Sequence, residues 1–242
     1  MDHNIVKQLE NDFGNKNLLD GKNHFILNDY DDSFLSYNRH PLAINCVGNS
    51  LLVRSSDINL LEELEREYSD YPAEWFMEIP NLIKLQDILK NHKMTLKNMA
   101  PIMGPSRSFK KIESPYVFTR IKEEDFSKFK GVTKHAFSFD DGIWKDRLAL
   151  AHYDKEKLIA IAGANQNSKY LWEIGVEKLA QNPKYKNLSS DLVNNLVSIA
   201  REENPEITVI YSTQFSHVKS MNVAARAGYD FAMSLIVGDT KE

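Results

Sequence analysis

The stretch that decides the fold runs from Leu171 to Gly228 and reads LWEIGVEKLAQNPKYKNLSSDLVNNLVSIAREENPEITVIYSTQFSHVKSMNVAARAG. An apolar strand pattern, Leu171–Val176, leads through a polar loop into a helical pattern that ends near Glu203. A second strand, Thr208–Tyr211, and a short helix that closes on Gly228 follow. Because the loop meets the start of a helix, unpaired backbone N–H groups and the positive end of the helix dipole gather there. The sequence therefore predicts a site for phosphate oxygens in this loop.

Composition and charge indicate a folded chain whose partner is small. The 242 residues are 42% hydrophobic and 26% charged, which is enough for one large core or two small ones. A formal net charge of -4 and a pI near 6.0 argue against nucleic-acid or anionic-membrane partners, which need clustered basic surface. No apolar run approaches the roughly 20 residues of a membrane span. The first residues also lack a signal-peptide pattern, so we expect a cytoplasmic protein.

Cysteine and histidine usage predicts no metal site. Cys46 is the only cysteine, which excludes an internal disulfide and a cysteine cluster. In the context Ala-Ile-Asn-Cys-Val it is typical of a small buried residue, and a nucleophilic role is the alternative. The histidines and acids show no metal-ligand spacing.

Residues 1–105 predict a smaller α/β domain. Glycine and asparagine at 48 and 49 favour a hairpin turn, and Asp57 is placed to cap a helix. Gly104-Pro105-Ser106 and the basic run that follows are typical of a linker. The expected elements are a helix at Ile5–Phe13, a hairpin of Leu42–Val47 and Leu51–Val53, a helix after Asp57, a strand at Trp75–Ile79, a helix capped by Asn81 and a strand at Met94–Met103.

Residues 106–242 predict a second domain that contains the opening stretch. A strand is expected at Tyr116–Ile121, and the acids from Glu123 to Asp125 favour a helix start. The strand patterns Leu148–Tyr153 and Leu158–Ala164 are joined across Asp154–Lys157, so a hairpin should precede the strand at Leu171. Tyr211 is expected to be buried in the sheet rather than to stack on bases.

From Leu148 onward this order of elements resembles the GNAT superfamily of acetyl-CoA-dependent N-acyltransferases. The residues that carry the resemblance are Trp172–Val176 followed by Asn182–Tyr185, the loop before the helix, and Ser220–Tyr229, which resembles the late helix of the family. The resemblance covers about half of the chain. It implies an α/β (α+β) fold with a mixed, mostly antiparallel central sheet flanked by helices, whose two central strands separate. Residues 1–105 would precede it, as a family-specific domain or a degenerate copy of the same fold.

The resemblance also implies how acetyl-CoA would bind as co-substrate. Backbone groups near Glu173 would pair with the pantetheine arm and polarise the thioester carbonyl. N–H groups of the loop would hold the pyrophosphate, with a lysine where the family has Arg or Gln. The cofactor-binding residues expected on this basis are Ile174, Gly175, Val176, Lys184, Asn187, Leu188, Ser189 and Ser190.

The chemistry of amine acetylation needs a group that removes a proton from the amine. Alternation places Glu173 and Gly175 on one strand face, so Glu173 is the first candidate for this base, and a solvated carboxylate is the alternative. On the resemblance, His217 and Ser220 would lie beside the thiol. His135, Asp140 and Asp141 are candidates for binding a cationic amine, although Asp140-Asp141-Gly142 is equally typical of a turn.

Several positions depart from the family pattern. Asn187 and Ser189 occupy slots where the family has Gly and Gly or Ala, and Asp191 places a carboxylate in the first helical turn. Ala224 stands where many members have a Tyr that protonates the leaving thiolate. The leading hypothesis is an N-acetyltransferase that acts by direct transfer on a small-molecule or peptide amine, as a monomer or homodimer. The alternative is a catalytically inactive GNAT-like binding or regulatory module.

Overall fold

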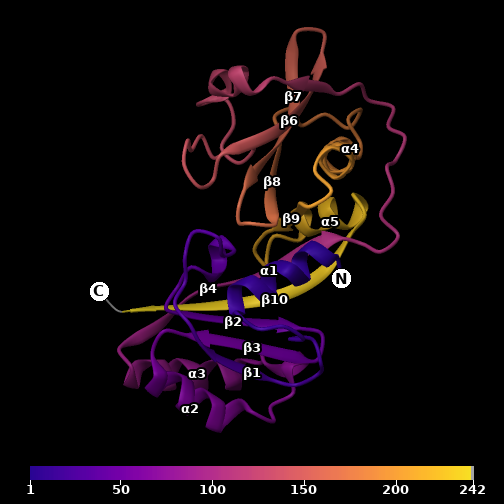
Figure 1. Cartoon of the computed structure of the whole chain (residues 1–242). Coiled ribbons are helices and arrows are strands. Elements are labelled where there is room, and N and C mark those ends of the chain that lie inside the picture. The colour runs from indigo at the N-terminus through magenta and orange to yellow at the C-terminus, as the bar shows by residue number, and fades with distance from the viewer. Residues whose placement is uncertain (241–242) are drawn as a thin grey trace. The chain divides into compact units, whose positions relative to one another are not determined.

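The computed structural model describes residues 1–240, which divide into two units (Figure 1). Unit 1 consists of Met1–Ile5 and Met103–Asp230. Unit 2 consists of Val6–Ile102 and the residues from Phe231 onward. Within residues 1–240, no helix combines the length and the apolar character needed to cross a membrane.

Unit 2 contains a sheet in which one strand, β10, comes from the far end of the sequence. Its strand order is β1-β3-β2-β10-β4, with β1 parallel to β3 and with β2 antiparallel to both β3 and β10. Residues 94–102 of β4 and 231–240 of β10 belong to this unit. The strands are β1 (His24–Leu27), β2 (Leu42–Val47), β3 (Ser50–Ser55), β4 (Met94–Pro105) and β10 (Tyr229–Thr240).

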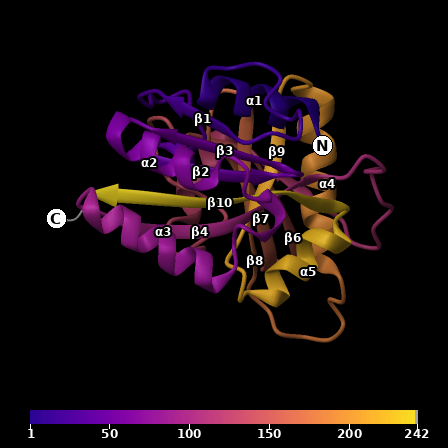
Figure 2. The ribbon, with the colours of Figure 1, turned by 90° about the horizontal axis from the view of Figure 1, so that it is seen from below.

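Two amphipathic helices supply about half of one buried cluster in unit 2. The helices α2 (Ile58–Tyr68) and α3 (Ile79–Asn91) lie on the same face of the sheet, whereas α1 (His3–Phe13) lies on the other (Figures 1 and 2). Their leucines pack in one buried cluster with residues of β2, β3 and β10. As predicted, Asp57 caps α2 by accepting from two backbone N–H groups.

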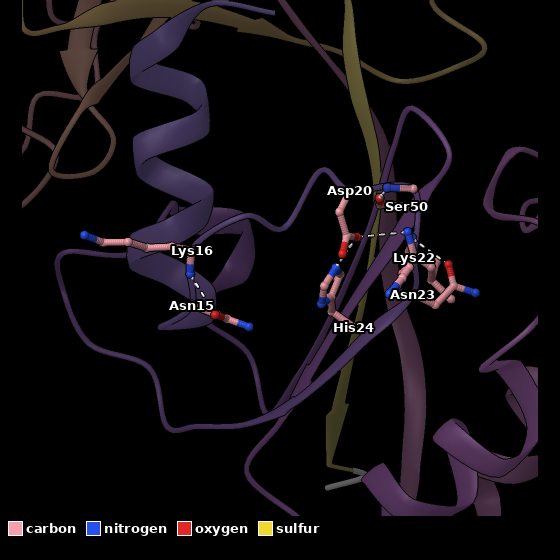
Figure 3. A network of polar contacts seen from close by, with 9 residues as sticks. Asn15, Lys16, Asp20, Lys22, Asn23, His24 and Ser50 are labelled. Carbon is pink, nitrogen blue, oxygen red and sulfur yellow. Dashed lines mark hydrogen bonds and ion pairs between the residues drawn. The ribbon is translucent and has the colours of Figure 1, made fainter.

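Polar contacts hold the start of β1 against the β2–β3 hairpin (Figure 3). The Gly21 N–H donates to Ser50 Oγ at 3.1 Å, and the Leu51 N–H donates to Asn23 Oδ1 at 3.0 Å. The hairpin turn itself forms at Gly48, whose φ is +57°. The hairpin predicted from Gly48-Asn49 is therefore confirmed.

One predicted strand in this unit is wrong. Trp75–Ile79 does not form a strand: a 3₁₀ turn covers Ala73–Trp75, and α3 begins at Ile79. Pro80, which suits the end of a strand, instead lies in the first turn of α3, where proline is favoured. Asn81 lies inside α3 rather than at its cap, and its amide donates to the Phe76 carbonyl at 2.6 Å.

Unit 1 contains a five-strand sheet in the order β9-β8-β7-β6-β5. Neighbours are antiparallel except β8 and β9, which are parallel. The mixed, mostly antiparallel sheet predicted for this part of the chain is therefore confirmed. The strands are β5 (Thr119–Ile121), β6 (Asp146–Asp154), β7 (Lys157–Gln166), β8 (Leu171–Lys178) and β9 (Thr208–Ser212).

Helices cover one face of this sheet, and irregular segments cover the other. The helix α4 (Leu188–Glu203) packs on β6, β7, β8 and β9 and contacts α5 (Val218–Arg226) (Figure 1). On the opposite face, a second cluster joins Phe126 and Phe137 to the sheet. Two expectations need correction here: the strand predicted at Tyr116–Ile121 begins only at Thr119, and Glu123–Phe129 is a 3₁₀ segment.

Candidate functional site

The site begins where β8 and β9 separate. Their ladder pairs run from Leu171↔Thr208 to Glu173↔Ile210 and then end. β8 continues as far as Lys178 and stays paired with β7 throughout, so β9 is the strand that departs. The separation opens a cavity of about 290 Å³ beside residues 173–176 of β8. Its lining residues are His135, Asn165, Glu173, Ile174, Gly175, Val176, Tyr211, Ser212, Thr213, His217 and Ser220.

The cavity draws side chains from both faces of the sheet. Ile174 and Tyr211 belong to the apolar cluster under α4. Glu173 and Gly175 alternate with Ile174 along β8, as the strand pattern predicted, and a Cβ at Gly175 would meet the His135 backbone on that face. A molecule placed between the separated strands would therefore meet different chemical groups on its two sides.

Two glycines bring the segment 133–137 onto the sheet. Gly163 and Gly175 are paired across β7 and β8. A Cβ at Gly175 would lie 1.6 Å from the His135 carbonyl oxygen, and one at Gly163 would lie 1.9 Å from that of Ala136. Side chains at these positions would overlap with backbone atoms, so the close approach requires glycine. The glycines thereby place His135 at the cavity.

Asn167 and Ser212 hold the Glu173 carboxylate. The Asn167 amide donates to Oε2 at 2.6 Å, and the Ser212 hydroxyl donates to Oε1. Asn167 is buried, and Ser212 is the last residue of β9. Sequence reasoning singled out Glu173 but not these two partners. Together they hold the carboxylate across the point where the strands separate.

A tyrosine that sequence reasoning assigned only to burial also lines the cavity. Tyr211 is 4% exposed, and its hydroxyl forms a 2.9 Å hydrogen bond with Ser220 Oγ. Burial raises the pKa of Tyr211 above its ordinary value, which the bond to Ser220 partly offsets. The phenol therefore stays protonated near neutral pH and can donate a proton. The signal available in the sequence was its position at the end of a strand, directly before Ser212 and Thr213.

The two histidines lie at the exposed side of the cavity. His217 precedes α5, and its Nδ1 lies 3.4 Å from Thr213 Oγ1. His135 is exposed and lies on the segment 133–137, whose close approach to the sheet requires Gly163 and Gly175. Both side chains therefore border the cavity without being enclosed by it.

The loop before α4 leaves the first turn of the helix without a side-chain cap. Asn187 adopts the left-handed conformation, with φ +61°, and no side chain caps the helix that starts at Leu188. Ser190 turns its hydroxyl back to the Asn187 carbonyl at 2.8 Å. The Lys184 ammonium pairs with the Asp154 carboxylate at 2.6 Å. Ser189 follows in the first turn.

Asp191, in the same first turn, is bonded to a neighbouring segment. It is buried and accepts from the Ser114 hydroxyl at 2.9 Å. Burial raises the pKa of this carboxyl, and the bond from Ser114 lowers it in part. Tyr116, from the same segment as Ser114, donates to the Lys186 carbonyl at 2.7 Å.

The predicted amine-binding set is divided between two places. Asp140 and Asp141 line a separate cavity of about 390 Å³ beside the 3₁₀ segment, whereas His135 lines the cavity at β8. Asp140 accepts from the backbone N–H groups of Gly142 at 3.0 Å and Trp144 at 3.1 Å. These bonds form the turn that was the alternative interpretation. Among residues 1–240, no group of three or more His, Cys, Asp or Glu is arranged to hold a metal ion.

These features define a mixed α/β unit with a cavity between two separating parallel strands. Solved structures that match the chain include a GNAT-family acetyltransferase from Colwellia psychrerythraea (16% identity, TM-score 0.46, 66% of this chain and 62% of that one). A GCN5-related N-acetyltransferase from Kribbella flavida matches with 16% identity and TM-score 0.46, over 65% of this chain and 64% of that one. A GCN5-related N-acetyltransferase-like protein from Streptococcus suis matches with 10% identity and TM-score 0.41, over 83% of each chain.

These matches include GNAT acetyltransferases, the family that the sequence resembles. The chain spans less than two thirds of the Colwellia and Kribbella proteins. No family model and no curated protein matches the sequence.

Proposed function

We propose that the chain is an acyl-CoA-dependent N-acetyltransferase that moves an acetyl group from acetyl-CoA to a primary amine. The observation that supports this proposal is the cavity between β8 and β9. It has a held carboxylate, Glu173, on one face of the sheet and a protonated hydroxyl pair, Tyr211 and Ser220, on the other. A base and an acid on opposite sides of one opening suit a reaction that removes one proton and supplies another.

Acetyl-CoA would enter from the α4 side of the opening. Backbone groups of Ile174–Val176, where β9 no longer pairs with β8, are available for the pantetheine arm and the thioester carbonyl. The uncapped N–H groups from Asn187 to Ser190 would hold the pyrophosphate. The Lys184 ammonium pairs with Asp154, and would exchange that carboxylate for phosphate oxygens to contribute positive charge here. The left-handed turn at Asn187 supports this fit.

The reaction would proceed by direct attack. The amine nitrogen forms a bond to the acetyl carbon while the carbon–sulfur bond of the thioester breaks. Glu173 accepts the proton that the amine loses, directly or through water, and the sulfur leaves as a thiolate. The thiolate takes a proton from Tyr211, whose hydrogen bond to Ser220 orients the phenol. His217 lies at the edge of the same cavity and would contact the thiol end or the acceptor.

Calorimetric titration with acetyl-CoA tests the proposal. Binding is expected, together with release of free thiol when a primary amine is added. An absence of binding at millimolar acetyl-CoA would overturn the proposal.

A second candidate function, an inactive binding or regulatory module, is favoured by two specific observations. Asp191 places a buried carboxyl in the first turn of α4, and Ala224, also buried, stands where a family acid is expected. Binding of acetyl-CoA without thiol release from a broad amine panel would favour this candidate.

A further inference from the structure

One polar atom at the cavity has no partner. Asn165 lines the cavity, and its Oδ1 is buried with no hydrogen-bond partner in the part of the chain that the structure describes. Buried acceptors in folded proteins are normally satisfied, because an unpaired acceptor loses its bonds to water without replacing them. The position therefore calls for a donor from a molecule that enters the cavity.

Asn165 lies next to Glu173. The two residues are directly paired across β7 and β8, which places their side chains on the same face of the sheet. The Asn165 amide and the Glu173 carboxylate are thus neighbours on the face that lines the cavity. Both are acceptors, and a primary ammonium group carries enough N–H donors to bond both at once.

The rest of the lining restricts what can be attached to that ammonium. Glu173 is the one carboxylate in the lining, and within residues 1–240 no lysine or arginine lines the cavity. The histidines His135 and His217 border it from its exposed side. A carboxylate on the substrate would lie near Glu173 with no fixed cation to pair with, which is unfavourable.

From these contacts we infer that Asn165 and Glu173 form a subsite for a primary ammonium group, and that the cavity selects amines without a carboxylate nearby. Alkylamines, amino sugars and lysine side chains fit this description, whereas free amino acids do not. The inference names the acceptor class of the proposed acetyltransferase and in that sense rests on it. Asn165 acts as a positioning and specificity residue, since it holds the amine for Glu173.

The test uses two amines of the same length and similar basicity, pentylamine and 5-aminopentanoate. Ligand-observed NMR titration of the full chain without acetyl-CoA measures their affinities independently of turnover. Pentylamine is expected to bind at least about tenfold more tightly than 5-aminopentanoate. Only 5-aminopentanoate brings a carboxylate, which the Glu173 carboxylate would repel. Equal affinities, or no binding of pentylamine, would overturn the inference.

Variants of β7 locate the effect. Asn165→Leu should weaken pentylamine binding by about tenfold or more, because a hydrogen bond to a charged group is lost. Asn165→Asp keeps the acceptor and should retain or improve the affinity. Gln166→Leu is the matched control: Gln166 is the next residue, faces the other side of the sheet and accepts from Arg147, so pentylamine binding should not change.

Folding and turnover are followed in the same variants. Circular dichroism reports whether Asn165→Leu folds, and if it does not, Asn165→Asp and the amine pair still decide the question. Where turnover occurs, Asn165→Leu should raise KM for the amine and leave KM for acetyl-CoA unchanged. Unchanged amine affinity in a folded Asn165→Leu chain would refute the inference. Binding of acetyl-CoA without binding of pentylamine would contradict this inference alone. Binding of pentylamine without binding of acetyl-CoA would contradict the proposed function alone.

Discussion

At the scale of single residues, Glu173 is the group whose replacement tests the proposed base. Glu173→Gln keeps the shape and one acceptor for Asn167 or Ser212 but cannot take a proton. The kcat of amine acetylation is expected to fall by about 10²- to 10⁴-fold, the usual contribution of a general base, with binding of acetyl-CoA unchanged. Steady-state kinetics with Glu202→Gln, an exposed helical position, as control measure the effect. Full activity in Glu173→Gln would leave positioning as the main source of rate.

Tyr211 carries the second prediction. Tyr211→Phe removes the hydroxyl that is hydrogen-bonded to Ser220. It keeps the aromatic ring, whose centroid lies 6.0 Å from that of Tyr229. Since a thiolate is itself a good leaving group, kcat should fall by about a hundredfold, at the lower end for acid catalysis. Tyr170→Phe, outside the cavity lining, serves as the control. A Tyr211→Phe chain with wild-type kcat would exclude Tyr211 as the proton donor.

Asp12, in the core of unit 2, carries a prediction about pH. It is fully buried and accepts from Gln8, Asn38 and the Leu35 N–H, yet burial raises its pKa from 3.8 to about 7. The folded state then binds more protons than the unfolded state between these values. The free energy of unfolding should therefore fall as pH rises from about 4 to 7, by up to about 1.4 kcal/mol per pH unit.

Urea unfolding at pH 5 and pH 7 checks this expectation. The free energy of unfolding should differ less between pH 5 and pH 7 in Asp12→Asn than in the wild type, because Asn does not titrate. The Asn amide suits the surrounding donors poorly, so the variant should be less stable at both pH values. The exposed Asp70→Asn should keep the wild-type pH dependence. An identical pH dependence in wild type and Asp12→Asn would refute the prediction.

Sequence reasoning reached some of these residues and missed others for a definite reason. Alternation along one strand was enough to place Glu173 on the face opposite Ile174. Ser212, which lies 39 residues away in sequence, and the unpartnered oxygen of Asn165 depend on which strands are neighbours and where they separate. The alternation of residues within one strand does not show which strands are its neighbours or where they separate. The candidate site was therefore predictable as a strand but not as a set of contacts.

At the scale of elements, the approach of segment 133–137 to β7 and β8 depends on two glycines. Gly175→Ala would place a Cβ against the His135 carbonyl, so the segment must move or the unit must lose stability. We expect a loss of about 1–3 kcal/mol, the usual range for overpacking, and weaker amine binding at the cavity. Thermal unfolding and the pentylamine titration measure both. Gly142→Ala, where the new Cβ meets only the Asp140 side chain, should have little effect, and an equally small effect of Gly175→Ala would contradict the expectation.

Elements with strong local signals were predicted well. The hairpins, the Asp57 cap and the strand–loop–helix at Leu171 follow from periodicity and turn chemistry, which act over a few residues. Trp75–Ile79 was predicted wrongly because Pro80 suits both a strand boundary and a first helical turn. Local preference does not distinguish these two uses of proline.

At the scale of the whole molecule, the sequence could not show that the last strand completes unit 2. β10 pairs with β2 through partners such as Ile236↔Ile44, and it lies between β2 and β4 in the strand order. Ile236 is 1% exposed and packs with the helix leucines of the same unit. Contacts between residues so far apart in sequence leave no periodic signal in either segment.

The boundary predicted after Pro105 can be tested on this basis. A fragment of residues 1–105 contains every other strand of unit 2 but lacks β10, so β2 and β4 each lose a neighbour and the core loses Ile236. We expect this fragment to unfold without cooperativity, and a synthetic peptide of residues 229–240 to restore a cooperative urea transition by adding the missing strand. The same peptide with Ile236→Asp should fail, because a carboxylate would be buried among apolar side chains. Cooperative unfolding of the fragment alone would show instead that residues 1–105 fold as an independent domain.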